Sequence, residues 1–356
     1  MRWVIPAPLA RAALASLPGL TIIVIAVLDV QFGPSVVLGL VVVAPLLSAN
    51  VAGPKVTAGY AAAALGVAAL LGLVHDVYVP GEAFHAQQIR LGLIALMGVV
   101  GVLLSRYRLD RERRLMQVTK VAEAAQRAIL LPVPEHFGPI HVAVQYESAA
   151  SDAMVGGDLY GFVVTPHGLR ILLGDVRGKG LDAVRMTAQV LATFRERAND
   201  DRQLPTLMSR LDGTVARAAE TDEDFVTAVL VQLANDGKVV VSNAGHPPPL
   251  FLSSAGAQWI QPSQVCPPLG LGGEGNAVSL NMAPRDRILL YTDGLTEARH
   301  PTTRRFYPEQ QIVGPLAAAT SVTDALAGLR QGVLEWSGGA LKDDIAMVLA
   351  EYRPAR

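Results

Sequence analysis

Long runs without a charged residue fill most of the first third of the chain. Four of these runs reach 15 residues or more, and a helix needs about 20 apolar residues to cross the hydrocarbon core of a membrane. The shortest run, at 91–105, reaches that length when the Arg90 side chain extends toward the lipid headgroups. Residues 1–104 are therefore predicted to form an all-α transmembrane domain with about four spans, near 12–29, 34–50, 56–74 and 88–105.

The charged residues in and around this part predict its orientation, because basic residues favour the cytoplasmic loops. With both ends inside, the residues on the cytoplasmic side are Arg2, Arg11, Lys55 and the basic cluster at 106–114. The residues at the outer side are then Asp29, Asp76 and Glu82. We therefore expect a multi-pass protein of the inner cell membrane whose later residues face the cytoplasm. A cleaved signal peptide is the alternative for the first run.

Residues 105–131 are predicted to form a helical linker. Its first half is basic, and anionic lipid attracts such a segment by about 1 kcal/mol per cation near the surface. Apolar residues then recur at alternating spacings of three and four, the seam of about two heptads: Leu115, Val118, Ala122, Ala125 and Ile129. This stripe has two interpretations: a parallel homodimer stalk that passes a signal from the membrane, or one helix that packs on its own domain.

From residue 132 the pattern changes to short apolar runs separated by polar turns. Runs rich in β-branched residues predict strands at 140–146, 160–164, 169–174, 226–233, 238–243, 287–292 and 345–352. Longer periodic segments predict helices at 180–199, 204–220 and 321–337. The helices come in two batches instead of alternating with strands, and short polar turns join strand pairs. We therefore expect an α+β domain with antiparallel sheets over residues 132–353.

Composition narrows the classes of function. A net charge of −1 over 356 residues gives no overall basic field, which argues against a nucleic-acid partner. The single cysteine, Cys266, excludes internal disulfides and cysteine-cluster metal sites. The first 104 residues hold no cluster of ionisable side chains of the kind that lines a transport pathway, which argues against a channel.

Acidic residues recur where an apolar strand meets a glycine-bearing or polar turn. They are Asp158, Asp175, Asp293 and the adjacent pair Asp343 and Asp344. Any one of them alone fits a turn-forming role, but carboxylates gathered at strand ends are how proteins hold a hard divalent cation. Histidine and cysteine are absent from matching positions, which argues against zinc. The sequence therefore predicts an oxygen-ligand metal site.

Ordered motifs around these residues resemble a known family. They are VGGDLY at 155–160, GDVRGKG at 174–180, FVT at 225–227, NAGHPP at 243–248, LLYTDGLTEAR at 289–299 and KDDI at 342–345. Together they resemble the metal-dependent serine/threonine protein phosphatases (PPM, the type 2C group), in the SpoIIE/RsbU branch. The resemblance covers about residues 130–352 and leaves out residues 1–104.

The resemblance implies a central β-sandwich flanked by helices, with two Mn²⁺ or Mg²⁺ ions at one edge. Carried over to this sequence, the implied ligands are Asp158, Asp175, Asp293, Asp343 and the carbonyl of Val176. Asp175 would bridge the ions, and Asp344 is the alternative to Asp343. A water molecule activated by the two metals would then attack the phosphorus, without a protein nucleophile.

The expected function is thus that of a membrane-anchored phosphatase. Its implied substrate is a small phosphoserine protein, such as an anti-sigma factor antagonist. The alternatives are a non-catalytic scaffold with the same fold, and a membrane sensor with the phosphatase as its output.

Three positions depart from the branch: Gly161 where aspartate is common, Lys179 where histidine is frequent, and Ala346 where threonine is frequent. His246 is either a general acid or part of a structural turn, and Arg177 and Lys179 are either phosphate contacts or solvated turn residues.

Overall fold

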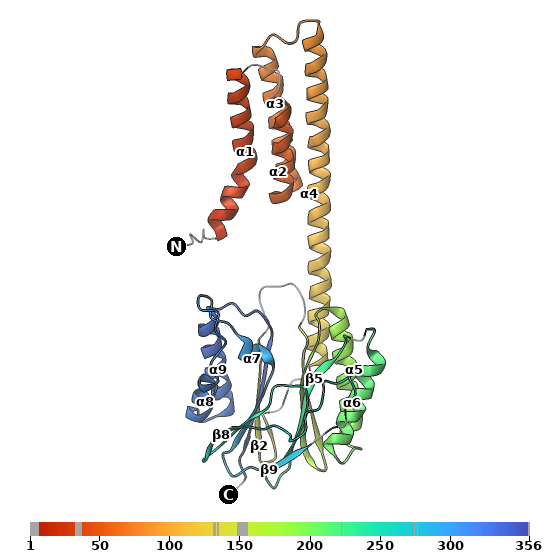
Figure 1. The fold of residues 1–356 in the computed structure, drawn as a ribbon, viewed down its shortest axis with the longest axis vertical. Coiled ribbons are helices and arrows are strands. Elements are labelled where there is room, and N and C mark those ends of the chain that lie inside the picture. The colour runs from red at the N-terminus through yellow and green to blue at the C-terminus, as the bar shows by residue number, and fades with distance from the viewer. Residues whose placement is uncertain are drawn as a thin grey trace. The chain divides into compact units, whose positions relative to one another are not determined.

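The computed structural model describes residues 7–32, 38–130, 133, 135–147, 156–221, 223–273, 275 and 277–354. The chain forms two compact units, residues 1–116 and 117–356, and the division falls within the long helix α4 (Glu82–Ile129) (Figure 1). The predicted fourth span and the predicted linker helix are therefore parts of one continuous helix. The side chains of Leu115 and of residues 118–129 lie outside the described residues, as do Pro132 and Pro134, so the heptad interpretation stays a prediction.

The first unit consists of helices. They are α1 (Ala7–Phe32), the 3₁₀ helix η1 (Leu38–Val42), α2 (Val43–Val51), α3 (Pro54–Val74) and the first part of α4. Small residues such as Ala44, Ala64 and Ala68 are fully buried where these helices pack, while large apolar side chains such as Ile23 and Leu70 are exposed. Large apolar side chains such as Val41 and Ile94 are buried as well, so the unit has an apolar interior and, in addition, an apolar outer surface of the kind that lipid can cover.

Two helical segments in the described residues, Pro54–Val74 and Glu82–Arg114, are long and apolar enough to cross a membrane. They contain the third and fourth predicted spans. The first two predictions coincide with shorter apolar helices at Ser16–Phe32 and Leu40–Val51, and the beginning of the predicted span at 34–50 lies outside the described residues. Four full-length spans are therefore not confirmed.

The second unit is a sandwich of two antiparallel sheets, and it confirms the predicted α+β class. One sheet has the order β1 (His136–Phe137), β2 (Ile140–Glu147), β11 (Ile345–Tyr352), β10 (Arg287–Tyr291), β7 (Leu250–Ser253) and β8 (Gly256–Trp259). The other has the order β3 (Asp158–Thr165), β4 (Gly168–Val176), β5 (Val226–Leu233), β6 (Lys238–Ala244) and β9 (Val278–Asn281). The seven predicted strands all exist, whereas the short strands β1, β7, β8 and β9 were not predicted.

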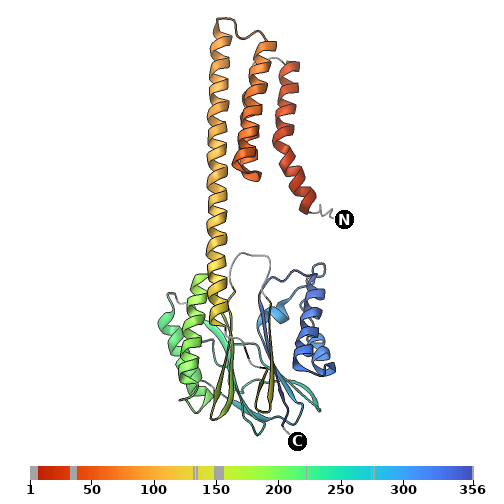
Figure 2. The same cartoon turned by 180° about the vertical axis from the view of Figure 1, so that it is seen from behind.

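Helices cover both outer faces of the sandwich (Figures 1 and 2). On one face lie α5 (Leu181–Arg197) and α6 (Leu204–Ala218), which contact β3, β4, β5 and β6. On the other lie α8 (Glu309–Ala318) and α9 (Val322–Ser337), which contact β7, β2 and β11. The three predicted helices agree with α5, α6 and α9 to within two residues at each end.

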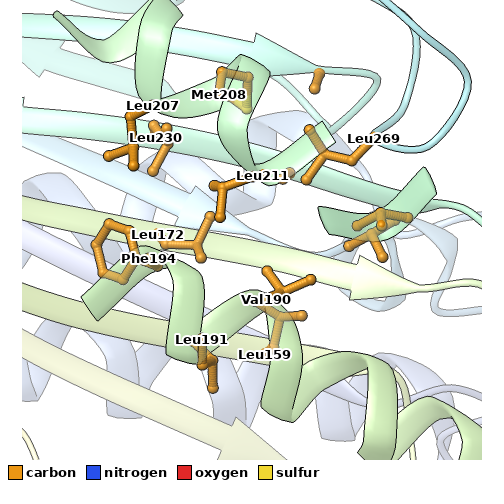
Figure 3. Close-up of a cluster of buried hydrophobic side chains, with 14 of the residues drawn as sticks. Leu159, Leu172, Val190, Leu191, Phe194, Leu207, Met208, Leu211, Leu230 and Leu269 are labelled. Carbon is orange, nitrogen blue, oxygen red and sulfur yellow. The ribbon is translucent and has the colours of Figure 1, made fainter. Parts of the chain in front are cut away.

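Three apolar layers hold the sandwich together. One lies under α5 and α6, where Phe194 packs with Leu159 and Leu172 (Figure 3). A second fills the space between the sheets, and a third lies under α8 and α9. Successive residues of β4, Ile171 and Leu172, enter different layers and are both fully buried. Most positions of this central strand are therefore apolar, because both of its faces are covered, and the buried Arg170 is paired through hydrogen bonds to Gln232 and to backbone carbonyls.

Candidate metal centre

The first two predicted ligands lie on neighbouring strands of one sheet. β3 begins at Asp158, β4 ends with Asp175 and Val176, and the antiparallel register sets Asp158 directly opposite Asp175. Directly opposed residues of an antiparallel pair project to the same face of the sheet. The register therefore brings both carboxylates together at one end of the sheet, next to the Val176 backbone.

The opposite sheet contributes at the same end through the segment after β10. Asp293 opens the short helix α7 (Asp293–Glu297), and the preceding Thr292 is fully buried. The Thr292 hydroxyl donates to Asp158 Oδ2 at 2.9 Å, which joins the two sheets. The Thr292 N–H donates to the Ala346 carbonyl at 3.0 Å, and the Ala346 N–H donates to Thr292 Oγ1 at 2.9 Å. These bonds fix Asp293 and the start of β11 beside the first pair of carboxylates.

Two glycines allow the backbone to approach these groups closely. A Cβ atom on Gly157 would lie 2.2 Å from the Val176 carbonyl oxygen and 2.4 Å from Asp175 Oδ1. A Cβ atom on Gly156 would lie 1.3 Å from Asp344 Oδ2. Because no real Cβ atom fits at such distances, the Gly-Gly pair before Asp158 forms a cradle that other residues would fill.

The pKa values of the carboxyl groups report concentrated negative charge. Burial, followed by the charge of Asp175, raises the pKa of Asp158 well above its usual range. Burial, together with the charges of Asp293 and Asp343, raises the pKa of Asp175 to about 7. Burial and then Asp343 also raise the pKa of Asp293. A cation bound among these groups would relieve this repulsion and restore the ionised forms.

The last two acidic residues differ in their surroundings. Asp344 is buried, and the Tyr146 hydroxyl donates to its Oδ2 at 3.1 Å. The Asp343 side chain is 53% exposed and forms an ion pair with Lys179, Nζ to Oδ1 2.9 Å. Both carboxylates lie near enough to raise the pKa of Asp175. The assignment of Asp343 as the ligand, with Asp344 as the alternative, therefore stays a prediction.

The residues around this edge fit a hard divalent cation by their chemistry. The donors are the oxygens of aspartates and of the Val176 carbonyl, the ligand type that Mn²⁺ and Mg²⁺ prefer. Within the described ranges, no three Asp, Glu, His or Cys side chains are arranged to hold one ion together. Two of the carboxylates are engaged elsewhere, because Asp158 accepts from Thr292 and Asp343 is paired with Lys179.

A mixed-charge cavity adjoins the carboxylates. It has a volume of about 270 Å³, and its lining includes Arg177, Lys179 and Arg185. The Arg177 guanidinium donates to the Glu223 carboxylate at 2.9 Å and lies over the ring of Phe225. The basic side chains that line this cavity therefore form ion pairs with nearby carboxylates, so Arg177 and Lys179 are not solvated turn residues alone.

His246 lies behind the site and is buried. Its Nδ1 is 2.9 Å from Thr227 Oγ1, and Thr227 faces Asp175 across β4 and β5. Asn243 fixes the turn by accepting from the His246 N–H at 2.8 Å and donating to the His246 carbonyl at 2.9 Å. Burial lowers the pKa of His246 to about 3, so the ring is neutral near pH 7. These contacts favour the structural-turn interpretation over the general acid.

Thr292 and Tyr146 were not predicted from the sequence. The available signal for Thr292 was its position between an apolar strand and a proposed ligand, inside the motif at 289–299. Tyr146 carried no such signal, because it is 198 residues from the aspartate that it contacts.

Comparisons with known proteins agree with the fold of the second unit. The family model described as Stage II sporulation protein E (SpoIIE) matches residues 165–353. The phosphoserine phosphatase RsbP of Bacillus subtilis is 28% identical over 159 residues, which make up 43% of this chain. The matched region spans only 39% of the length of RsbP.

Two solved structures share the fold. The PP2C domain of SiaA from Pseudomonas aeruginosa superimposes with a TM-score of 0.55 at 17% identity, covering 70% of this chain and 99% of that one. The RsbU and RsbW domains of Rv1364c from Mycobacterium tuberculosis give a TM-score of 0.52 at 23% identity, covering 61% of this chain and 62% of that one. At these identities the likeness establishes the fold and not the activity.

Proposed function

The chain belongs to the SpoIIE family, and on this premise we propose that it is a metal-dependent serine/threonine protein phosphatase. The observation that carries the proposal is the direct opposition of Asp158 and Asp175 at the end of one sheet, with Asp293 held beside them by the other. Three buried or half-buried carboxylates with raised pKa values destabilise a protein unless they serve a ligand.

The proposed ligands of two Mn²⁺ or Mg²⁺ ions are Asp158, Asp175, Asp293, Asp343 and the Val176 carbonyl. When bound, the ions would activate a water molecule and neutralise the phosphoryl oxygens. Four carboxylates balance the charge of two divalent cations, so a phosphate dianion can approach. Thr292 orients Asp158 through its hydrogen bond. His246 holds Thr227 behind Asp175 and, being neutral, does not protonate the leaving serine oxygen.

The proposed substrate is phosphoserine on a regulatory protein, of the anti-sigma factor antagonist type. The curated relative RsbP is named as a phosphoserine phosphatase, and the sequence motifs resemble the SpoIIE/RsbU branch. The cavity beside Val176 has Arg177 and Arg185 among its lining residues, and in this proposal it receives the residues that flank the phosphoserine.

We further propose that residues 1–104 anchor the phosphatase in the inner cell membrane, with the catalytic domain in the cytoplasm. The support is the apolar length of the segments Pro54–Val74 and Glu82–Arg114 and the exposure of large apolar side chains on the first unit. The basic cluster at 106–114 supports the orientation. A homodimer through residues 105–131 belongs to the same proposal and rests on the heptad spacing alone.

A non-catalytic scaffold is the second candidate function, and one observation favours it. Lys179 neutralises Asp343, a proposed ligand, as a cation would. A domain that had lost metal binding would keep the fold and could retain such an ion pair permanently.

One assay separates the two functions. The full chain in detergent micelles is incubated with a phosphoserine peptide, with Mn²⁺, Mg²⁺, Zn²⁺ or a chelator, and phosphate release is measured. We expect release with Mn²⁺ or Mg²⁺ and none with chelator, because all proposed ligands are hard oxygens. Hydrolysis in chelator, or with zinc alone, contradicts the metal assignment. No hydrolysis with any ion supports the scaffold.

A further inference from the structure

Lys179 and Asp343 form an ion pair between two distant segments at the candidate metal centre. The Lys179 Nζ lies 2.9 Å from Asp343 Oδ1, and 164 residues separate them in sequence. Lys179 belongs to the turn between β4, which ends at Val176, and α5, which begins at Leu181. The pair therefore joins the turn that follows one set of proposed ligands to the segment that carries another.

The charge of Lys179 acts on more than one of the acidic residues. It counters the increase in the pKa of Asp175 that comes from burial and from neighbouring carboxylates. A single ammonium group thus partly neutralises a cluster in which the acidic side chains otherwise repel one another. This is the electrostatic role that a metal ion would have at the same place.

The turn around Lys179 is open on the side of its two glycines. Gly178 and Gly180 flank it with φ angles of +106° and +93°, which glycine adopts without strain. Neither glycine has a heavy atom within 4 Å of where a Cβ would lie. The Lys179 side chain also lines the cavity of about 270 Å³. A displaced ammonium group therefore has room on one side, and no packed core must be disrupted to release it.

We propose that Lys179 is a built-in competitor for the divalent cation at Asp343. Its ammonium group binds the carboxylate in the metal-free protein and leaves when an ion binds, so that Lys179 weakens the affinity of the centre for metal while stabilising the metal-free fold. This inference rests on the proposed function, because it takes Asp343 to be a ligand.

The proposal predicts opposite changes in two measurable quantities. Replacing Lys179 by methionine keeps the length of the side chain and removes its charge. A part-exposed ion pair is worth up to about 1 kcal/mol, so Lys179→Met should tighten Mn²⁺ binding by about two- to fivefold. The same change should lower the melting temperature of the metal-free protein, because the carboxylates lose a neutralising charge. A residue with only a packing role would lower both the affinity and the stability.

The experiment uses the full chain in detergent, with Mn²⁺ titrated calorimetrically and melting followed in chelator. Lys179→Arg keeps the charge and should bind Mn²⁺ like the wild type. Lys342→Met removes the same charge from the exposed neighbour of Asp343 and should change neither quantity. If Lys179→Met leaves the affinity unchanged, weakens it, or changes it no more than Lys342→Met does, the competitor role is wrong.

Asp343→Asn separates this inference from the proposed function. Weaker Mn²⁺ binding in Asp343→Asn together with an unchanged affinity in Lys179→Met would overturn the competitor role alone. Unchanged Mn²⁺ binding in Asp343→Asn would overturn the ligand assignment and the competitor role together. If the wild type binds no Mn²⁺, both the metal-dependent activity and the inference are refuted.

Discussion

Thr292 donates its hydroxyl hydrogen to Asp158 at 2.9 Å, and this bond joins the two sheets of the sandwich at the candidate metal centre. The bond opposes the increase in the pKa of Asp158 that burial causes. It also leaves Thr292 Oγ1 free to accept from the Ala346 N–H. One buried hydroxyl group therefore both favours the ionised form of a proposed ligand and fixes the start of β11.

Thr292→Val should weaken the fold and the metal centre together. The variant leaves the buried Ala346 N–H without its 2.9 Å acceptor, and such a loss costs about 1–3 kcal/mol of the free energy of unfolding. Thr292→Ser keeps the hydroxyl and should retain most of the stability. Urea unfolding of the three proteins in chelator measures the difference. Equal stability of the valine and serine variants would show that the hydroxyl is not needed.

The stability of the metal-free protein should fall as the pH rises from about 4 to 7. The pKa of Asp175 is about 7 in the folded chain and 3.8 when unperturbed. Between these values the folded state holds a proton that the unfolded state has released, so each pH increase favours unfolding. Above pH 7 this group adds no further change.

Asp175→Asn should reduce the decrease in stability between pH 4 and 7, and it should raise the melting temperature near pH 7 in chelator. The remaining slope comes from Asp158 and Asp293, whose pKa values are also raised. Asp200→Asn, a change at an exposed acidic residue, is the control and should follow the wild type. Melting curves recorded from pH 4.5 to about 8 test this, and a slope of opposite sign in the wild type would refute the account of the repulsion.

Gly157→Ala should abolish metal-dependent turnover. The added methyl group would lie 2.2 Å from the Val176 carbonyl oxygen, a proposed ligand, so the backbone must shift. Gly314→Ala, in α8, meets no heavy atom within 4 Å and should leave turnover unchanged. It should also stabilise the helix, by at most about 1 kcal/mol. Phosphate release and circular dichroism of both variants give the comparison, and a Gly157→Ala protein with wild-type turnover would place the metal elsewhere.

The C-terminus should lie in the cytoplasm. The basic cluster at 106–114 follows the last apolar segment and favours the inner side of the membrane. A green fluorescent protein fused after Arg356 should fluoresce, and alkaline phosphatase fused at the same point should be inactive. The reverse pattern would overturn the proposed orientation.

The fold was predictable from the sequence where a strand is long and buried on both faces. β4 and β11 appear as mostly apolar runs, because each side of the strand contacts a separate apolar layer. The short strands β7, β8 and β9 have only four residues each, too few for a pattern to identify them, so their pairing partners define them. The apolar runs at 12–29 and 34–50 predicted helices, but local pattern alone did not fix the length of each.

The candidate site was predictable in its acidic residues but not in their partners. Asp158 and Asp175 could be found because glycines and strand ends mark them in the sequence. Asp343 and Asp344 differ in their contacts, because Lys179 pairs with Asp343 and Tyr146 donates to Asp344, and both partners come from distant parts of the sequence. The Tyr146 contact depends on the pairing of β2 with β11, and the Lys179 contact depends on the approach of segments from the two sheets. No local spacing encodes either of them.

The most direct test of the central claim is the turnover of Asp175→Asn in saturating Mn²⁺. The full chain and this variant are compared for phosphate release from a phosphoserine peptide, with circular dichroism to confirm that both are folded. If Asp175 is a ligand of the metal centre, the rate should fall far below a tenth of the wild-type rate. A tenfold change corresponds to a barrier difference of about 1.4 kcal/mol. A folded variant that keeps more than about a tenth of the wild-type rate would contradict the proposed metal centre.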